Sequence, residues 1–96
     1  MTSALTPEQI EQALERLPGW AYQQQAFCKT FCFQTFSEAI SFIVRLAFEA
    51  EALNHHPEIR NVYQRVEIIL TTHDAGNQVT ARDLQLAETI ERFIWV

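Results

Sequence analysis

The sequence predicts an α+β fold whose helices and strands follow the order αββαββα. Three stretches carry apolar residues at the spacing of an amphipathic helix, and four shorter stretches are suited to strands, two of which (residues 26–34 and 65–72) alternate at the period of two. The strands come in two pairs, each suited to an antiparallel hairpin. This pattern favours a four-stranded antiparallel sheet with three helices packed on one face. The 96 residues are enough for a single core, so residues 1–96 are expected to form one domain.

The first predicted helix begins at Thr6. Its hydroxyl can cap the helix, Pro7 suits the first helical position, and Gln9 completes a capping box. The pattern then stops at Pro18-Gly19. The apolar residues that recur at helical spacing are Ile10, Ala13, Leu14 and Leu17.

The next two segments, residues 20–24 and 26–34, are predicted strands. The linker at Gln24-Gln25 is short, so a hairpin is expected although the usual Asn-Gly turn is absent. In the second strand, Phe27, Lys29, Phe31 and Phe33 share one face, and Cys28, Thr30 and Cys32 share the other. Cys28 and Cys32 would lie ~13 Å apart on that strand. A disulfide needs Cα atoms within ~7 Å, so these two cysteines are expected to be free.

A longer helix is predicted over residues 38–53, with Ser37 as its cap. Because Pro57 disfavours helical dihedrals at His56, this helix should end near Asn54 or His55. Its predicted apolar side is formed by Ile40, Ile43, Val44, Ala47 and Ala50, together with Glu51.

The second strand pair is expected at residues 58–61 and 65–72, and a loop follows at residues 74–78. Thr80-Ala-Arg-Asp83 has the form of a capping box and opens the last helix. That helix should direct inward Leu84, Ala87, Ile90 and Ile94. The uncovered sheet face would be partly apolar through Ile69 and the phenylalanines, so it must be covered or stay partly exposed, and a partner subunit is one candidate for the cover.

Charge and hydropathy exclude several classes of partner. The net charge is -5 and the seven basic residues are scattered, which argues against binding to a nucleic-acid backbone. No apolar run approaches the roughly 18 residues of a membrane helix. The start, Met-Thr-Ser-Ala-Leu-Thr-Pro-Glu, lacks the features of a signal peptide. A cytoplasmic protein without a membrane partner is expected.

The three histidines are the candidates for chemistry. His55 and His56 are adjacent, and His73 ends a strand that could return to them. Imidazole titrates near neutrality, so such a cluster suits proton transfer. Glu51 lies four residues before His55, and the carboxylate is expected to orient that ring or raise its basicity. The end of the helix adds partial negative charge that favours the imidazolium.

Other interpretations of these residues remain open. Three imidazoles can bind zinc, although adjacent histidines rarely chelate one ion and no helical His-x-x-x-His pair exists. Surface histidines without a role are another alternative. Nucleophilic catalysis is disfavoured, because Cys28 and Cys32 have no local base and no Gly-x-Ser-x-Gly motif is present. The charges of Arg65, Glu67 and Arg82 are interpreted as solvated.

Nearly the whole chain resembles the pterin-4a-carbinolamine dehydratase family. The specific motifs are Glu51-x-x-x-His55-His56-Pro57, Asn61-Val62-Tyr63, Thr72-His73 and Thr80-x-x-Asp83. The resemblance implies the αββαββα fold and dehydration of 4a-hydroxytetrahydropterin to quinonoid dihydropterin in pterin recycling. It implies that His55, His56 and His73 form the catalytic pterin pocket, with Glu51 supporting His55. Our own hypothesis is that His55 and His73 are the acid/base groups and that His56 mainly positions the pterin.

The resemblance also implies contacts to the substrate from Glu51, His56, Pro57 and Asp83. Neither a metal nor an organic cofactor is expected. The pterin would be the small-molecule partner, and the assembly a homodimer or homotetramer. The alternative is a non-catalytic member of the family that acts as a dimerisation or enzyme-assembly cofactor.

Overall fold

The computed structural model describes residues 3–96 and has the predicted order of elements. Residues 1 and 2, the first two of the predicted domain, lie outside the described residues. The sheet order is β1-β2-β4-β3, and every neighbouring pair is antiparallel. The elements are α1 (Pro7–Glu15), β1 (Ala21–Gln23), β2 (Ala26–Cys32), α2 (Phe36–Leu53), β3 (Glu58–Val62), β4 (Arg65–Leu70), the 3-10 turn η1 (His73–Ala75) and α3 (Ala81–Phe93). The predicted fold class is confirmed.

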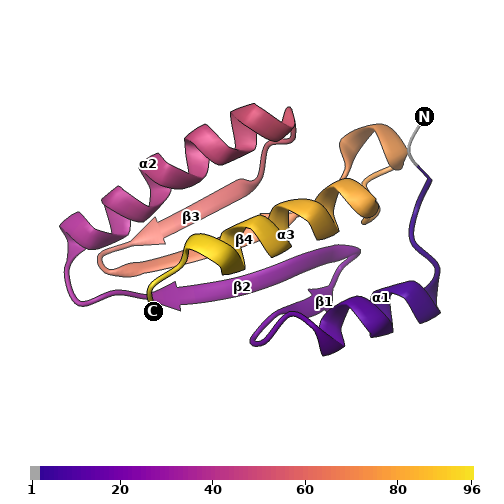
Figure 1. The fold of residues 1–96 in the computed structure, drawn as a ribbon, viewed down its shortest axis with the longest axis horizontal. Coiled ribbons are helices and arrows are strands. Elements are labelled where there is room, and N and C mark those ends of the chain that lie inside the picture. Colours follow the sequence, from indigo (N-terminus) through magenta and orange to yellow (C-terminus); the bar gives the residue numbers. More distant parts are fainter. Residues whose placement is uncertain (1–2) are drawn as a thin grey trace.

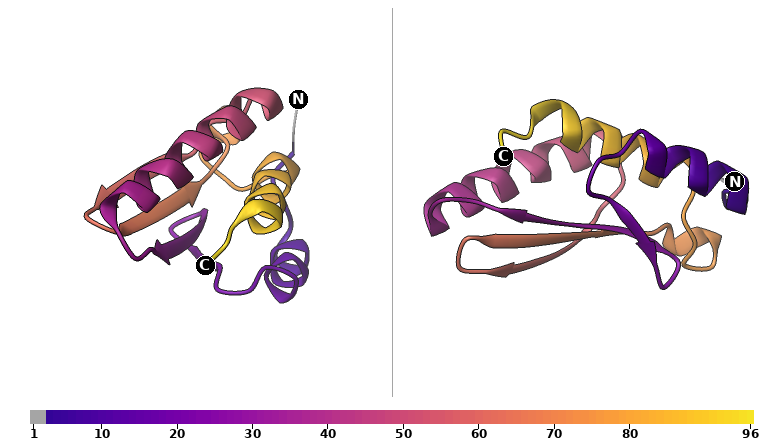
Figure 2. Two further views of the ribbon diagram at one scale, coloured as in Figure 1. Left: turned by 60° about the vertical axis from the view of Figure 1, so that its left-hand side comes forward. Right: turned by 90° about the horizontal axis from the view of Figure 1, so that it is seen from below.

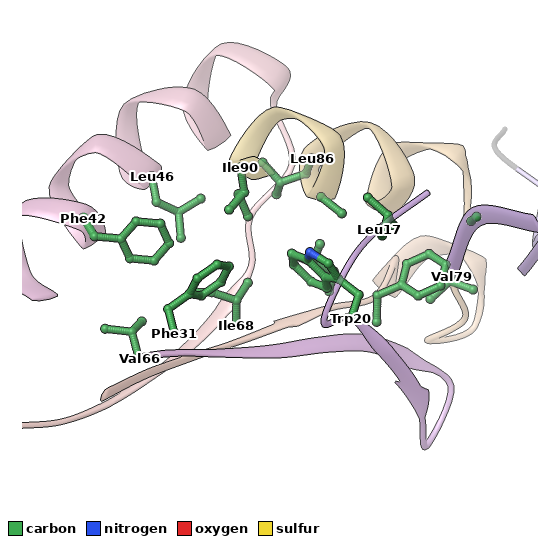
Figure 3. Close-up of a cluster of buried hydrophobic side chains, with 14 of the residues drawn as sticks. Leu17, Trp20, Phe31, Phe42, Leu46, Val66, Ile68, Val79, Leu86 and Ile90 are labelled. Atoms are coloured by element: carbon green, nitrogen blue, oxygen red, sulfur yellow. The ribbon is translucent and has the colours of Figure 1, made fainter. Parts of the chain in front are cut away.

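All three helices lie on one face of the sheet, as Figure 1 and the edge-on view in Figure 2 show. The core fills the space between α2, α3 and the two central strands (Figure 3). Phe42 and Leu46 come from α2, Leu86 and Ile90 from α3, and Phe31, Val66 and Ile68 from the sheet. Burial of this apolar surface is the main force that holds the helices against the sheet.

Helix α2 differs from its prediction in two respects. Its cap is Thr35, whose hydroxyl accepts the N–H of Glu38, and not Ser37. The fully buried row consists of Ala39, Phe42, Leu46 and Ala50, so Ala50 is as predicted, Ile43 packs against the core at its edge, and the rest of the row lies one residue earlier than expected. Ile40 and Val44 are therefore exposed. Helix α2 carries two neighbouring apolar rows, and helical periodicity alone does not choose between them.

The open face of the sheet is more polar than predicted. Phe27, Phe31 and Phe33 all lie on the face that the helices cover. The open face carries Cys28, Glu67 and the half-buried Ile69, with Arg60 and Glu58 of β3 beside them. Because the phenylalanines are already covered by the helices, they do not require a partner subunit on the open face.

The ends of α3 and α1 follow local rules. Both predicted capping boxes form, at Thr6 with Gln9 and at Thr80 with Asp83. In α3, Leu86, Ala87 and Ile90 are fully buried, whereas the predicted inward residue Leu84 is only half-buried and Ile94 follows the helix end. Among residues 3–96, no helix is long and apolar enough to cross a membrane.

Candidate active site

Three segments meet at one end of the molecule: the end of α2, the chain that leaves β4, and the start of α3 (Figure 1). They enclose an open pocket of about 360 Å³. The residues that line it are Asn54, His55, His56, Thr71, Thr72, His73, Asp74 and Arg82. The predicted convergence of the three histidines is therefore present in the structure.

A left-handed turn at Asn54 redirects the chain just before the two adjacent histidines. Asn54 has a left-handed backbone (φ 52°), which Asn adopts more readily than most residues. The N–H of Asn54 donates to Glu51 O, and the N–H of His55 donates to Ala50 O, which closes the helix. These two bonds form a Schellman motif. His55 thus turns inward, whereas His56 remains on the surface.

His55 is buried against α3. Its Nε2 lies 2.5 Å from Oδ1 of Asp83, which is fully buried. Oδ2 of the same carboxylate accepts the N–H of Thr80 at 2.9 Å and the hydroxyl of Thr72 at 2.7 Å. A carboxylate with several donors is the form of Asp that burial tolerates. Nε2 of His55 is then the donor. Nδ1 has no hydrogen-bond partner within residues 3–96 and is not fully buried, so we infer that it is open to the pocket that His55 lines.

The expected partnership between Glu51 and His55 is wrong. Glu51 Oε1 lies 2.7 Å from Nε2 of His56, and both side chains are mostly exposed. The prediction assumed that His55 continues the helical surface, but α2 ends at Leu53 and the reversal at Asn54 exchanges the partners. Glu51 therefore orients His56.

His73 is held from the other side of the pocket. It opens η1, directly after Thr72 pairs with Gln78, and its Nδ1 lies 2.9 Å from Oδ1 of Asn77. The amide oxygen is an acceptor, so Nδ1 donates and Nε2 of His73 is the nitrogen without this bond. Within the described part of the chain, Nδ1 of His55 and Nε2 of His73 are thus free of protein partners, as is Nδ1 of the exposed His56, whose Nε2 is bonded to Glu51.

Three predicted substrate contacts do not line the pocket. Among residues 3–96, the lining contains neither Glu51 nor Pro57 nor Asp83. Asp83 is fully buried, so the expected contact between Asp83 and a substrate is replaced by its contact with His55. Pro57 follows the histidine pair and directly precedes β3.

The sequence interpretation treated Arg82 as a solvated charge and did not predict its place in the pocket. Its guanidinium lines the pocket and donates to the carbonyl oxygen of Asn54, which links α3 to the end of α2. A signal for this role was available: a cation in the first turn of a helix opposes the helix dipole, so it needs a partner elsewhere.

The other reactive groups lie away from the pocket. Cys28 and Cys32 are both free, as predicted. Partial burial, and next the carboxylate of Glu67, raise the pKa of the Cys28 thiol. Within residues 3–96, no three His, Cys, Asp or Glu side chains are grouped so as to hold a metal ion.

Comparison with known proteins gives the family. The sequence model described as pterin 4 alpha carbinolamine dehydratase matches residues 3–93. The chain belongs to the pterin-4a-carbinolamine dehydratase family. One relative, from Opitutus terrae and provisionally named a pterin-4-alpha-carbinolamine dehydratase, is 55% identical over 96 residues, which are 100% of this chain and 99% of the relative.

Two further relatives agree with this family membership. A protein of Prochlorococcus marinus with the same provisional name is 50% identical over 86 residues, covering 90% of this chain and 88% of its own. A crystal structure from Brucella melitensis, described as a transcriptional coactivator/pterin dehydratase, superposes with a TM-score of 0.87 at 37% identity. It covers 93% of this chain and 96% of its own, so the fold is that of the family.

Proposed function

We propose that this protein dehydrates 4a-hydroxytetrahydropterin to quinonoid dihydropterin and water. The observation that supports this most directly is the pocket itself, in which three histidines converge and one of them is backed by a buried carboxylate. The family membership supports the same reaction class, a hydro-lyase acting on a pterin. In this proposal residues 1–96 form one catalytic domain.

The reaction needs one base and one acid. The bond between C4a and the hydroxyl oxygen breaks, the oxygen leaves as water after gaining a proton, and the N5 proton is removed as the C4a–N5 double bond forms. We assign His55 as the base, since Asp83 stabilises the imidazolium that forms when Nδ1 accepts the N5 proton. His73 donates the proton to the leaving hydroxyl through Nε2.

His56 and Arg82 position the substrate in this scheme. His56 stands at the rim with its Nε2 tied to Glu51, which leaves Nδ1 as a hydrogen-bond acceptor for the pterin. Arg82 uses one terminal nitrogen on Asn54, and its other N–H groups are donors for the carbonyl oxygen of a pterin. The balance of atoms requires no redox step and no added group.

The deciding experiment is stopped-flow dehydration of synthetic 4a-hydroxytetrahydropterin. The wild type should exceed the spontaneous rate, and His55→Ala and His73→Ala should each lower kcat by about 10²- to 10⁴-fold, the contribution of one positioned acid or base. His56→Ala should act mainly on KM. A wild-type rate equal to the spontaneous rate contradicts the proposal.

Two controls separate the alternatives. Activity that survives a chelator supports the histidine mechanism, whereas a complete loss would indicate a catalytic metal. A folded wild type without any activity would favour a non-catalytic assembly module. The similarity to the Brucella melitensis protein motivates this alternative, because that protein is described as a coactivator as well as a dehydratase.

We also propose that the protein is a cytoplasmic homo-oligomer, a dimer or a tetramer. Two free thiols suit a reducing compartment. Helix α2 exposes a second apolar row at intervals of four residues, formed by Phe36, Ile40, Val44 and Phe48. The row contains no charge, so the same row of another copy is complementary to it, and ridges at this spacing pack well between helices.

A further inference from the structure

Two threonine hydroxyls stand behind the His55–Asp83 pair. Thr72, at the end of β4, places Oγ1 2.7 Å from Oδ2 of Asp83. Thr80, the cap of α3, places its own Oγ1 2.7 Å from that of Thr72. All three residues are almost completely inaccessible to solvent: 2% of Thr72 and none of Thr80 or Asp83 is exposed. Water therefore does not replace any of these bonds.

The direction of each bond follows from the donors available. The N–H of Thr80 donates to Oδ2 of Asp83, so this oxygen is an acceptor. The single hydroxyl proton of Thr72 then points to Oδ2 as well. Thr72 can only accept from Thr80, whose hydroxyl donates to it while accepting the N–H of Arg82. The Thr80 hydroxyl thus donates to Thr72, and the Thr72 hydroxyl donates to the carboxylate of Asp83.

We propose that Thr72 and Thr80 are positioning residues that hold Asp83 as a carboxylate and so fix the proton of His55 on Nε2, with the lone pair of Nδ1 directed to the pocket. This inference rests on the proposed function, because it explains how His55 is kept ready to accept a proton. Neither hydroxyl needs to touch the substrate. The pair acts on the reaction only through Asp83 and His55.

Removal of the Thr72 hydroxyl weakens this arrangement. Oδ2 of Asp83 then faces a methyl group in place of a donor, so the carboxylate is held less firmly and its bond with Nε2 of His55 no longer fixes the tautomer. The His55 proton then moves to Nδ1 in part of the population. That ring has no lone pair toward the pocket. Neutral His in the wrong tautomer is inactive as a base.

The test is the tautomer of His55, observed by nitrogen-15 NMR of histidine-labelled protein. The wild type and Thr72→Ser should show Nε2 protonated and Nδ1 as acceptor, whereas Thr72→Val should shift the population toward protonated Nδ1. The kcat of Thr72→Val should fall about 10- to 100-fold, the loss typical when an outer-shell partner of a metal-ligating histidine is removed, with KM nearly unchanged. Thr72→Ser should restore it. Thr80→Val, which removes only the outer hydroxyl, should lie between them.

Controls keep the inference distinct from a loss of folding. Thr89, a buried threonine on α3 that donates to Gln85 O, lies outside the pocket lining, so Thr89→Val should change neither tautomer nor kcat. Urea unfolding identifies any variant that does not fold, and Thr72→Cys, which keeps a weak donor, is the second variant and should be intermediate. An unchanged His55 tautomer in folded Thr72→Val, or an equal effect of Ser and Val, overturns the inference. The NMR result stands even if the wild type fails the dehydration assay.

Discussion

His55 and His56 are neighbours in sequence and differ in almost every physical respect. His55 is buried and bonded to a buried carboxylate, whereas His56 is mostly exposed and bonded to the exposed Glu51. An exposed ion pair of this kind contributes little to stability, about 0–1 kcal/mol, because water screens it. His55 is therefore the more strongly positioned of the two histidines, and its partner is Asp83 rather than Glu51.

The raised pKa of Cys28 gives a prediction at the same scale. In Cys32→Ser, Cys28 is the one remaining thiol. Its rate of alkylation by iodoacetamide should be low near neutral pH, increase with pH, and level off only above the ordinary pKa of a thiol. The cause is partial burial and the carboxylate of Glu67, which both disfavour the thiolate. Mass spectrometry measures the rate against pH.

The sign of the linked stability follows from the same pKa. Because the folded state holds the Cys28 proton more tightly than the unfolded state, the contribution to stability is full below the unfolded pKa and is lost as pH rises through the folded pKa. Cys28→Ser, which leaves the exposed Cys32, is the matched control for reactivity. An alkylation rate of Cys28 that levels off below the ordinary thiol pKa would disprove the prediction.

Among the secondary-structure elements, the first hairpin is under backbone strain. Gln23 pairs with Ala26, so Gln24 and Gln25 form a two-residue turn, and both have positive φ (52° and 65°). Turns with two such residues prefer Asn and Gly, because side chains beyond Cα oppose the left-handed region. The hairpin therefore forms without Asn-Gly. Pairing of β1 with β2 holds the turn in a backbone conformation that Gln24 and Gln25 do not favour.

Gln25→Gly should relieve this strain and raise the free energy of unfolding by about 1 kcal/mol. The hydrogen bond from Thr71 to the carbonyl oxygen of Gln25 is retained, since it uses the backbone. Gln23→Gly is the control: that residue lies in β1, and Gly there should be destabilising by about 0.5–1 kcal/mol. Urea unfolding compares the two, and equal losses in both variants would show that the turn is not strained.

At the scale of the whole molecule, α2 is used on two sides. Phe42 and Leu46 face the core, and the exposed row of Phe36, Ile40, Val44 and Phe48 faces outward, with 72% of Phe48 exposed. An uncharged row of this kind is typical of an interface between subunits. The predicted oligomer thus has a more apolar surface on this helix than on the open face of the sheet.

Val44→Glu should dissociate the proposed oligomer into monomers of 11.1 kDa, because it places a charge in the middle of the exposed apolar row of α2. Light scattering after gel filtration measures the mass. Ser41→Glu adds the same charge to an exposed position of α2 outside the row and should leave the mass unchanged. A monomeric wild type, or equal masses for both variants, would rule out this interface.

The sequence offered the convergence of the three histidines only as a geometric possibility, but it was sufficient for the order of elements and for both capping boxes. These features arise from interactions between residues close in the chain: hydrophobic periodicity, caps at Thr6 and Thr80, and the restriction that Pro57 places on His56. Such local preferences are written into short segments. The family resemblance added the reaction that the histidines suggest.

The tertiary structure decided which partner each histidine has and which row of α2 is buried. The bond between His55 and Asp83 joins residues 28 positions apart, and it exists because the left-handed Asn54 turns His55 toward α3. Arg82 and Thr72 acquire their roles in the same way, through contacts across segments. Helical spacing placed Glu51 beside His55, but the end of the helix at Leu53 removed that geometry and left Asp83 as the buried partner.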